Sequence, residues 1–228
     1  MLGLLLRAEK PLAEDLLVTL LRITAIGGHG TPGAALAWAI REMDAQAGVR
    51  ERLRAEAAGL ADAVDTGELR SPAYTTAFVK EILRAYTPAW LLTRMVTTPV
   101  RLRDWTLPAG QRILLSPYLV HRDERWWEEP DRVEPRRWLS GTRPHAEHAY
   151  LPFGAGPCKR FGSRIGMALL TIAVAALAGS HRVTGPDWSQ IPHRPDVLLV
   201  PGPARVRFEA VTTRAEATRN GEPWWTRA

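Results

Sequence analysis

The chain has 228 residues, of which 46% are hydrophobic and 24% are charged, and its formal net charge is +6. This length and composition are typical of one globular domain with a real core and argue against a disordered protein. The single cysteine excludes an internal disulfide framework but leaves the compartment unspecified. The first ten residues read poorly as a signal peptide, so we expect a reducing, cytoplasmic location by default. Basic and acidic residues are interspersed and form no recognised nucleic-acid motif, so we expect no nucleic-acid partner.

The first predicted element is a long helix over residues 11–40. Glu14 and Asp15 lie near its start, where acidic side chains suit the helix dipole. Its middle, residues 27–33, holds four glycines and one proline. Glycine adds backbone entropy and proline removes a hydrogen-bond donor, so we predict that the helix is broken there. A second, charged helix or a pair of helices is predicted over residues 41–65.

The central part of the chain predicts a helix, then short strands, then an irregular segment. An amphipathic helix over residues 74–86 is ended by Thr87 and Pro88. Residues 93–115 alternate as short strands do, with a turn at residues 108–110. Residues 121–156 lack periodicity but contain large rings that favour burial, so we expect an ordered irregular segment. These rings are Trp126, Trp127, Trp138 and Tyr150.

The last predicted elements are a helix over residues 164–179 and a closing hairpin over residues 197–210. The helix contains the longest apolar stretch, residues 167–179, which is too short to span a bilayer. We therefore expect a buried helix and no membrane partner. We divide the chain into one domain, residues 1–210, and a polar C-terminal tail, residues 211–228.

Two charged patterns stand out in these elements. Glu81 and Arg84 are spaced i and i+3, so they share a helix face and can form a pair. Arg136 and Arg137 lie in the irregular segment, and an arginine there would fix that segment to the helix if it joined the pair. A buried glutamate with two arginines must be fully hydrogen-bonded to be tolerated.

A third pattern, FGAGPCKRFG at residues 153–162, stands directly before a predicted helix and holds the only cysteine, Cys158. Its glycines allow the backbone to approach a flat ligand closely. A thiolate at a helix N-terminus is stabilised by the helix dipole and can bind iron. The alternative for a lone cysteine is a buried, inert side chain.

Taken in this order, the three patterns resemble the cytochrome P-450 family, and the similarity extends over about residues 16–208. The sequence between them is also similar to the soluble bacterial members, in PAWLLTRMV, LPAGQRILLSPYLVHRDERWWEEPDRVEPRRWL and YLPFGAGPCKRFGSR. The resemblance implies a mainly α fold with small β-sheets, namely the C-terminal part of the cytochrome P-450 fold, truncated.

The resemblance also implies a haem-dependent monooxygenase that inserts one oxygen atom from O2 into a small organic substrate. Its cofactor would be haem b. Its electrons would come from NAD(P)H, indirectly, through a ferredoxin-type or flavoprotein donor.

The resemblance gives roles to single residues. Glu81, Arg84 and Arg137 would form a structural triad, and Arg94 would pair with a haem propionate. His121 falls in a stretch near the same region, as a haem contact or, alternatively, as a loop histidine satisfied by the protein.

The remaining implied roles belong to the haem loop and the oxygen-binding helix. In the loop, Phe153, Gly156 and Gly162 would surround the haem. In the helix, Gly28 and Thr31 would line the oxygen-binding groove, which would explain the predicted break.

The chain departs from the family in its length and its oxygen-binding motif. It is about half the usual length, so much of the substrate pocket would be missing. The family pattern places an acid before the threonine, and that acid relays protons with it. Here the motif reads GGHGT over residues 27–31, with Gly30 in place of the acid. Thr31 remains as a catalytic candidate, and His29 is either a substitute proton donor or a bystander.

The haem loop departs as well, because Cys158 stands at the usual arginine position and Arg160 at the usual cysteine position. A guanidinium stays protonated and cannot bind iron. The iron ligand would then be Cys158, displaced by two residues, or the haem would bind weakly or not at all. Three functions stay open: an active monooxygenase, an inactive truncated remnant, and one half of a split monooxygenase.

The haem loop and the helix after it carry a group of positive charges at Lys159, Arg160 and Arg164. Such a basic surface would attract an acidic electron-transfer protein. A solvated helix start is the alternative.

Overall fold

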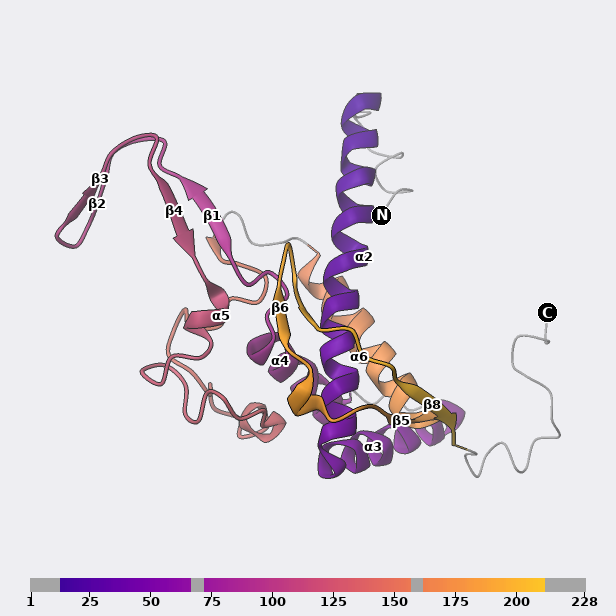
Figure 1. Cartoon of the computed structure of the whole chain (residues 1–228). Coiled ribbons are helices and arrows are strands. Elements are labelled where there is room, and N and C mark those ends of the chain that lie inside the picture. The colour runs from indigo at the N-terminus through magenta and orange to yellow at the C-terminus, as the bar shows by residue number, and fades with distance from the viewer. Residues whose placement is uncertain (1–12, 67–71, 157–161, 212–228) are drawn as a thin grey trace.

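A computed structural model describes residues 13–66, 72–156 and 162–211 of the chain. Packed helices form the body of the molecule, and short two-stranded β-ribbons surround it (Figure 1). The long helices are α2 (Glu14–Ala45), α3 (Ala47–Thr66), α4 (Ala73–Ala85) and α6 (Ser163–Ser180). The predicted mainly α fold with small β-sheets is therefore confirmed.

Helix α2 runs without interruption through residues 27–33 and keeps Pro32 inside it, so the predicted break is wrong. A proline in a helix interior costs about 3 kcal/mol. The half of α2 that follows it is held by burial, and its buried apolar residues are Ala34, Ala35, Trp38, Ala39 and Met43. Because each large buried side chain contributes roughly 1.5–3 kcal/mol, this packing outweighs the local cost.

The junction after α2 lies at Gln46 rather than near residue 41. The backbone of Gln46 is extended (φ −119°, ψ 95°), and its side-chain amide donates a 2.6 Å hydrogen bond to Oε2 of Glu42. Helix α3 follows at once and leads toward α4. Glu56 of α3 accepts hydrogen bonds from the backbone amides of Tyr74 (2.8 Å) and Thr75 (2.7 Å), which satisfies the first turn of α4.

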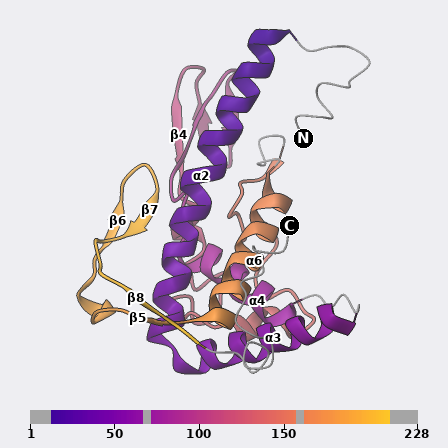
Figure 2. The ribbon, with the colours of Figure 1, turned by 90° about the vertical axis from the view of Figure 1, so that its right-hand side faces the viewer.

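Helix α6 contacts α2, α3 and α4, and the four helices share one core (Figure 2). Val174 of α6 and Phe78 of α4 are fully buried there. A Cβ at Gly179 would lie 3.2 Å from Cβ of Ala57, so the small residue lets α6 approach α3 closely. Among the described residues α6 alone has the length and mean hydropathy (1.5) of a membrane span, but its contacts are those of a core helix.

Only the inner face of α6 is buried, so the predicted buried helix is correct for one face. Its outer face is apolar and exposed, with Ile172 66% exposed. The N-terminal half of α2 has the same character, with Ile26 76% exposed, and it extends beyond the other helices (Figure 1). Exposed apolar surface on a helix face is typical of an interaction site.

The predicted strands of residues 93–115 are present as two antiparallel ribbons. Strand β1 (Leu92–Met95) pairs with β4 (Arg112–Leu115), and β2 (Val100–Leu102) pairs with β3 (Trp105–Leu107). Gly110 closes the predicted turn with φ 84°, a conformation that glycine adopts without strain. After β4 comes the expected irregular segment, which contains the short helices α5 (Pro117–Val120) and η1 (Pro135–Trp138).

The predicted closing hairpin is wrong, because its strands pair with other partners. Strand β8 (Arg207–Ala210) pairs with β5 (His181–Thr184), while β7 (Leu199–Pro201) pairs with β6 (His193–Pro195). The short helix η3 (Trp188–Gln190) lies between β5 and β6.

One residue of strand β7, Leu199, is hydrogen-bonded to α2 through its carbonyl and to the chain just after α4 through its amide. The carbonyl of Leu199 accepts a 3.0 Å bond from Nε1 of Trp38, and its amide donates a 2.9 Å bond to the carbonyl of Pro88. Local sequence gives no sign of these long-range bonds, which is why the pairing was not predicted.

Candidate functional site

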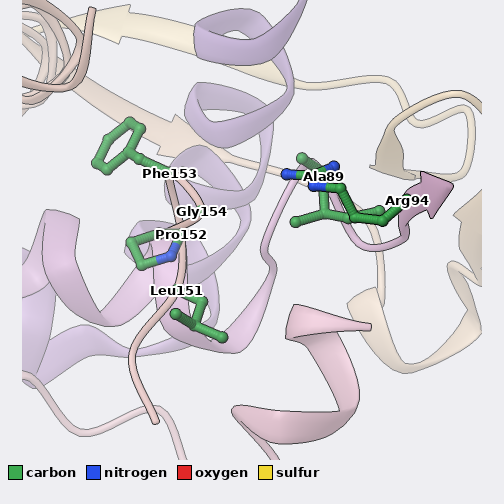
Figure 3. A pocket seen from close by; sticks show the side chains of 7 residues that line it. Ala89, Arg94, Leu151, Pro152, Phe153 and Gly154 are labelled. Atoms are coloured by element: carbon green, nitrogen blue, oxygen red, sulfur yellow. The ribbon is translucent and has the colours of Figure 1, made fainter. Parts of the chain in front are cut away.

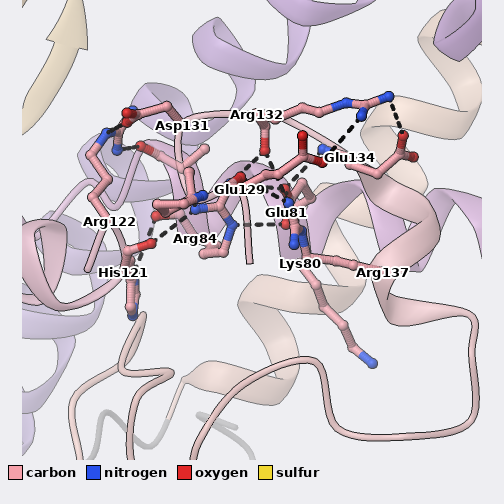
Figure 4. A network of polar contacts seen from close by, with 12 residues as sticks. Lys80, Glu81, Arg84, His121, Arg122, Glu129, Asp131, Arg132, Glu134 and Arg137 are labelled. Carbon is pink, nitrogen blue, oxygen red and sulfur yellow. Dashed lines mark hydrogen bonds and ion pairs between the residues drawn. The ribbon is translucent and has the colours of Figure 1, made fainter. Parts of the chain in front are cut away.

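The three charged residues that the sequence singled out meet in the core (Figure 4). Glu81 and Arg84 are fully buried side chains of α4, joined by two hydrogen bonds of 2.9 and 3.0 Å. Nε of Arg137, from η1, lies 3.0 Å from Oε1 of Glu81. The predicted three-way pairing is therefore present in the structure.

The sequence did not reveal how completely this cluster is hydrogen-bonded. Glu81 also accepts bonds from the backbone amide of Glu134 (2.9 Å) and from Nε1 of Trp138 (2.9 Å). Arg84 donates to the carbonyls of His121, Pro130 and Arg132, at 2.9, 2.6 and 2.9 Å. A buried ion pair requires that its polar atoms be hydrogen-bonded in this way. The same bonds tie the irregular segment to α4.

His121 is fully buried beside this cluster. Its Nδ1 lies 2.7 Å from Oγ1 of Thr87 and 3.1 Å from the carbonyl of Arg84. Its Nε2 accepts a 2.7 Å bond from the backbone amide of Leu151. Both ring nitrogens thus have protein partners, and the arrangement favours the satisfied loop histidine over a haem contact. Burial lowers the pKa of His121 to about 3, so the ring is neutral at physiological pH.

Leu151 begins the segment that leads to the predicted haem loop, and this segment lines a pocket with β1 (Figure 3). The pocket has a volume of about 160 Å³. Its lining residues are Ala89, Leu92, Arg94, Leu151, Pro152, Phe153 and Gly154. The structure therefore brings Arg94 to the same pocket as Phe153, as the resemblance implies.

Arg94 is an exposed residue of β1, and its Nη1 donates a 2.8 Å bond to the carbonyl of Thr93. Within the described residues no carboxylate pairs with its guanidinium. The pocket thus has a positive charge at its edge that is available to an anionic group.

The loop has the backbone that its glycines predict. Gly154 has φ 73° and Gly156 has φ 64°, a region that residues with a side chain rarely adopt. The ring of Phe153 lies over α6, where a Cβ at Gly166 would be 3.7 Å from it. Gly162 is the N-cap of α6. Cys158, Lys159 and Arg160 lie outside the described residues.

The oxygen-binding motif lies on the exposed half of α2. His29 is exposed and Thr31 is half-buried. At Gly30, where the family has an acid, a Cβ would lie 3.3 Å from Cδ1 of Leu198 in the turn between β6 and β7. Leu198 therefore restricts the space that a longer side chain at this position would need.

Comparison with known proteins agrees with this architecture. Cyclooctatin synthase from Streptomyces melanosporofaciens is 36% identical over 202 residues, which are 85% of this chain and 42% of that protein. Cyclooctat-9-en-7-ol 5-monooxygenase from the same organism is 31% identical over 195 residues, 80% of this chain and 42% of that protein. The chain thus spans less than half the length of these curated relatives.

A solved structure, the haem domain of a cytochrome P450DA mutant, has the same fold. It aligns with a TM-score of 0.81 at 20% identity and covers 92% of this chain and 48% of that one. The sequence profile of the cytochrome P450 family matches residues 2–208. The chain therefore belongs to the cytochrome P450 family.

Proposed function

We propose that this chain provides the C-terminal half of a haem-dependent monooxygenase, which inserts one oxygen atom from O2 into a small organic substrate. One observation carries the proposal: Arg94 and the haem-loop residues Phe153 and Gly154 line a single pocket. The family relationship supports it, because one relative is a monooxygenase. The proposal includes a cytoplasmic location and electrons from NAD(P)H, passed through a ferredoxin-type or flavoprotein donor.

The described residues fit the edge of a haem. A guanidinium that has no carboxylate partner among the described residues suits a propionate, and it stands opposite an aromatic ring and a glycine backbone that suit a flat apolar ring. A pocket of about 160 Å³ holds only part of such a ligand, since pockets for drug-sized ligands measure roughly 300–1,000 Å³. The remaining surface must come from another part of the protein.

In this proposal Arg94 would hold a propionate of haem b, and Phe153, Gly156 and Gly162 would belong to the loop that holds the ring. Cys158 supplies the thiolate, because it is the only thiol in the chain. Bound haem supplies the chemistry that activates dioxygen. Thr31 of α2 would supply a proton-donating hydroxyl.

His29 is the other residue proposed to deliver protons. It is exposed on α2, close to the position where the family has its acid. A ring nitrogen of an imidazole can donate a hydrogen. In this proposal His29 therefore takes the role of the acid whose position is occupied by Gly30.

The electron donor would dock near the start of α6. Arg164 is exposed there. An acidic partner would be attracted by this charge, together with the charges of Lys159 and Arg160, and salt would weaken the attraction.

A specific set of observations favours the second candidate, a catalytically impaired remnant or one half of a split enzyme. Helix α2 is continuous where family members open it, Leu198 restricts the space beside Gly30, and the usual ligand position is Arg160. The exposed apolar faces of α2 and α6 require a covering partner, which a second half-chain would supply.

Haem reconstitution separates these candidates. Purified protein is mixed with haemin, reduced, exposed to carbon monoxide and examined by absorption spectroscopy. A thiolate-type Soret band that disappears in Cys158→Ser supports Cys158 as the ligand. Retained haem without such a band, or no retained haem, contradicts activity of this chain alone.

Two further arms locate the defect if haem is not retained. The double exchange Cys158→Arg with Arg160→Cys restores the family order, and haem uptake then assigns the defect to the loop. Addition of the N-terminal half of the Streptomyces relative tests the split enzyme. Haem uptake only in that mixture supports a half-chain, and failure in every mixture supports a remnant.

A further inference from the structure

His121 connects two parts of the chain that meet beside the pocket. Its backbone carbonyl accepts a bond from Arg84, and its Nδ1 faces Thr87 and the carbonyl of Arg84, at the C-terminal end of α4. Its Nε2 faces the amide of Leu151. The side chain is fully buried, so no water replaces any of these bonds. The imidazole thus bridges α4 and the segment that enters the haem loop.

The bonding partners determine the tautomer of this ring. A backbone amide only donates, so Nε2 must be the unprotonated nitrogen and Nδ1 must carry the hydrogen. Oγ1 of Thr87 donates its own hydrogen to the carbonyl of Leu83, at 2.8 Å. It is therefore free to accept from Nδ1. The network is complete only with a neutral ring, since a proton on Nε2 would face the Leu151 N–H.

The bond to Leu151 acts on the pocket through a turn. The carbonyl of Leu151 accepts a 3.1 Å bond from the amide of Gly154, which closes the turn of residues 151–154. Leu151, Phe153 and Gly154 all line the pocket opposite Arg94. Fixing the Leu151 amide therefore fixes the whole turn relative to α4.

We propose that His121, as its Nδ1–H tautomer, is a positioning residue that holds the turn of residues 151–154 against the end of α4 and so sets the pocket opposite Arg94. It does not touch the pocket, because it is fully buried and acts through Leu151. The position of the turn belongs to the protein alone. Its consequence for haem rests on the proposed function.

A matched pair of variants separates the two ends of this bridge. In His121→Asn the side-chain amide nitrogen replaces Nδ1, which keeps the bonds to α4 but removes the acceptor for Leu151. In His121→Gln the side-chain oxygen reaches the position of Nε2 and keeps that acceptor. Both variants are neutral and polar, and correcting each for its own global stability removes the packing effect of the methylene by which they differ.

Amide hydrogen exchange by NMR is the main measurement, with the amide of Val174, in the buried middle of α6, as a reference for global stability. We expect the amides of Leu151 and Gly154 to exchange roughly tenfold faster in His121→Asn than in His121→Gln, after this correction. A nitrogen correlation spectrum of the wild-type ring should show Nδ1 protonated. Equal exchange in the two variants, or a protonated Nε2, would overturn the proposal.

A haemin titration of the same variants tests the link to the pocket. We expect haemin to bind several-fold more weakly to His121→Asn than to His121→Gln. Equal affinities combined with different exchange rates would overturn the claim that the turn sets the pocket. If even the wild-type chain binds no haemin, the proposed function fails, and the exchange rates alone decide on His121.

Discussion

Replacing Glu81 by alanine tests whether the buried cluster holds the irregular segment to α4. The carboxylate of Glu81 accepts hydrogen bonds from Arg84, Arg137 and Trp138 and from the backbone of Glu134. In Glu81→Ala all of these donors lose their acceptor at once. The guanidinium of Arg84 keeps its bonds to backbone carbonyls but becomes a fully buried charge with no counter-ion.

The size of the effect follows from this burial. Removing one partner of a buried ion pair costs about 3–5 kcal/mol, because the remaining charge stays uncompensated. For a chain of this length each kcal/mol lowers the melting temperature by about 2–4 °C, so a decrease of roughly 10 °C is expected. Glu81→Gln keeps the volume and one acceptor, and we expect an intermediate loss.

Urea denaturation monitored by circular dichroism measures the free energy of unfolding of these variants. Glu147→Ala is the matched control, because its side chain is 73% exposed and its partner His148 lies 3.8 Å away. We expect this control to change stability by no more than about 0.5 kcal/mol. A loss below about 1 kcal/mol in Glu81→Ala would refute the view that the cluster holds the segment in place.

Three further predictions concern α2, pH and the pocket. Gly28→Ala should raise the free energy of unfolding by about 0.5–1 kcal/mol, since its Cβ meets nothing within 4 Å. Gly30→Ala should raise the free energy of unfolding by less in the same urea experiment, because its Cβ would contact the side chain of Leu198 closely. Equal increases in the two variants would contradict that contact. The free energy of unfolding should fall between pH 6.5 and about 3, because the unfolded chain protonates His121 while burial lowers its folded pKa to about 3. His121→Gln should flatten this slope in pH-dependent denaturation, and an unchanged slope would speak against a buried neutral ring. Arg94→Gln should weaken haemin binding roughly tenfold, yet leave binding of haemin dimethyl ester unchanged, in absorption titrations. Equal losses for both ligands would show that Arg94 does not pair with a propionate.

The sequence alone was sufficient for the family and for the charged cluster. Glu81 and Arg84 share a helix face because of their spacing, and Arg137 lies in a segment whose bulky rings require burial. The loop glycines were also readable, since a positive φ at Gly154 and Gly156 requires the residue type that the sequence shows.

Predictions from the sequence were wrong where packing between distant parts of the chain outweighs the local conformational preference. Residues 27–33 disfavour a helix, yet α2 continues, because Trp38 and its neighbours are buried further along. The last strands look like one hairpin, yet β8 pairs with β5 and β7 pairs with β6, while Leu199 of β7 is bonded to Trp38 and Pro88. Such contacts join residues far apart in the chain, and no local pattern encodes them.

His121 shows most clearly which features follow from the sequence and which follow only from the tertiary structure. The sequence determined that a histidine stands in a stretch typical of the family, and it left a haem contact and a satisfied loop residue open. Only the tertiary structure shows the protein partners of the ring, because it brings the amide of Leu151 to Nε2 and the end of α4 to Nδ1. A ring nitrogen has no preference for either partner until the fold places one within 3 Å.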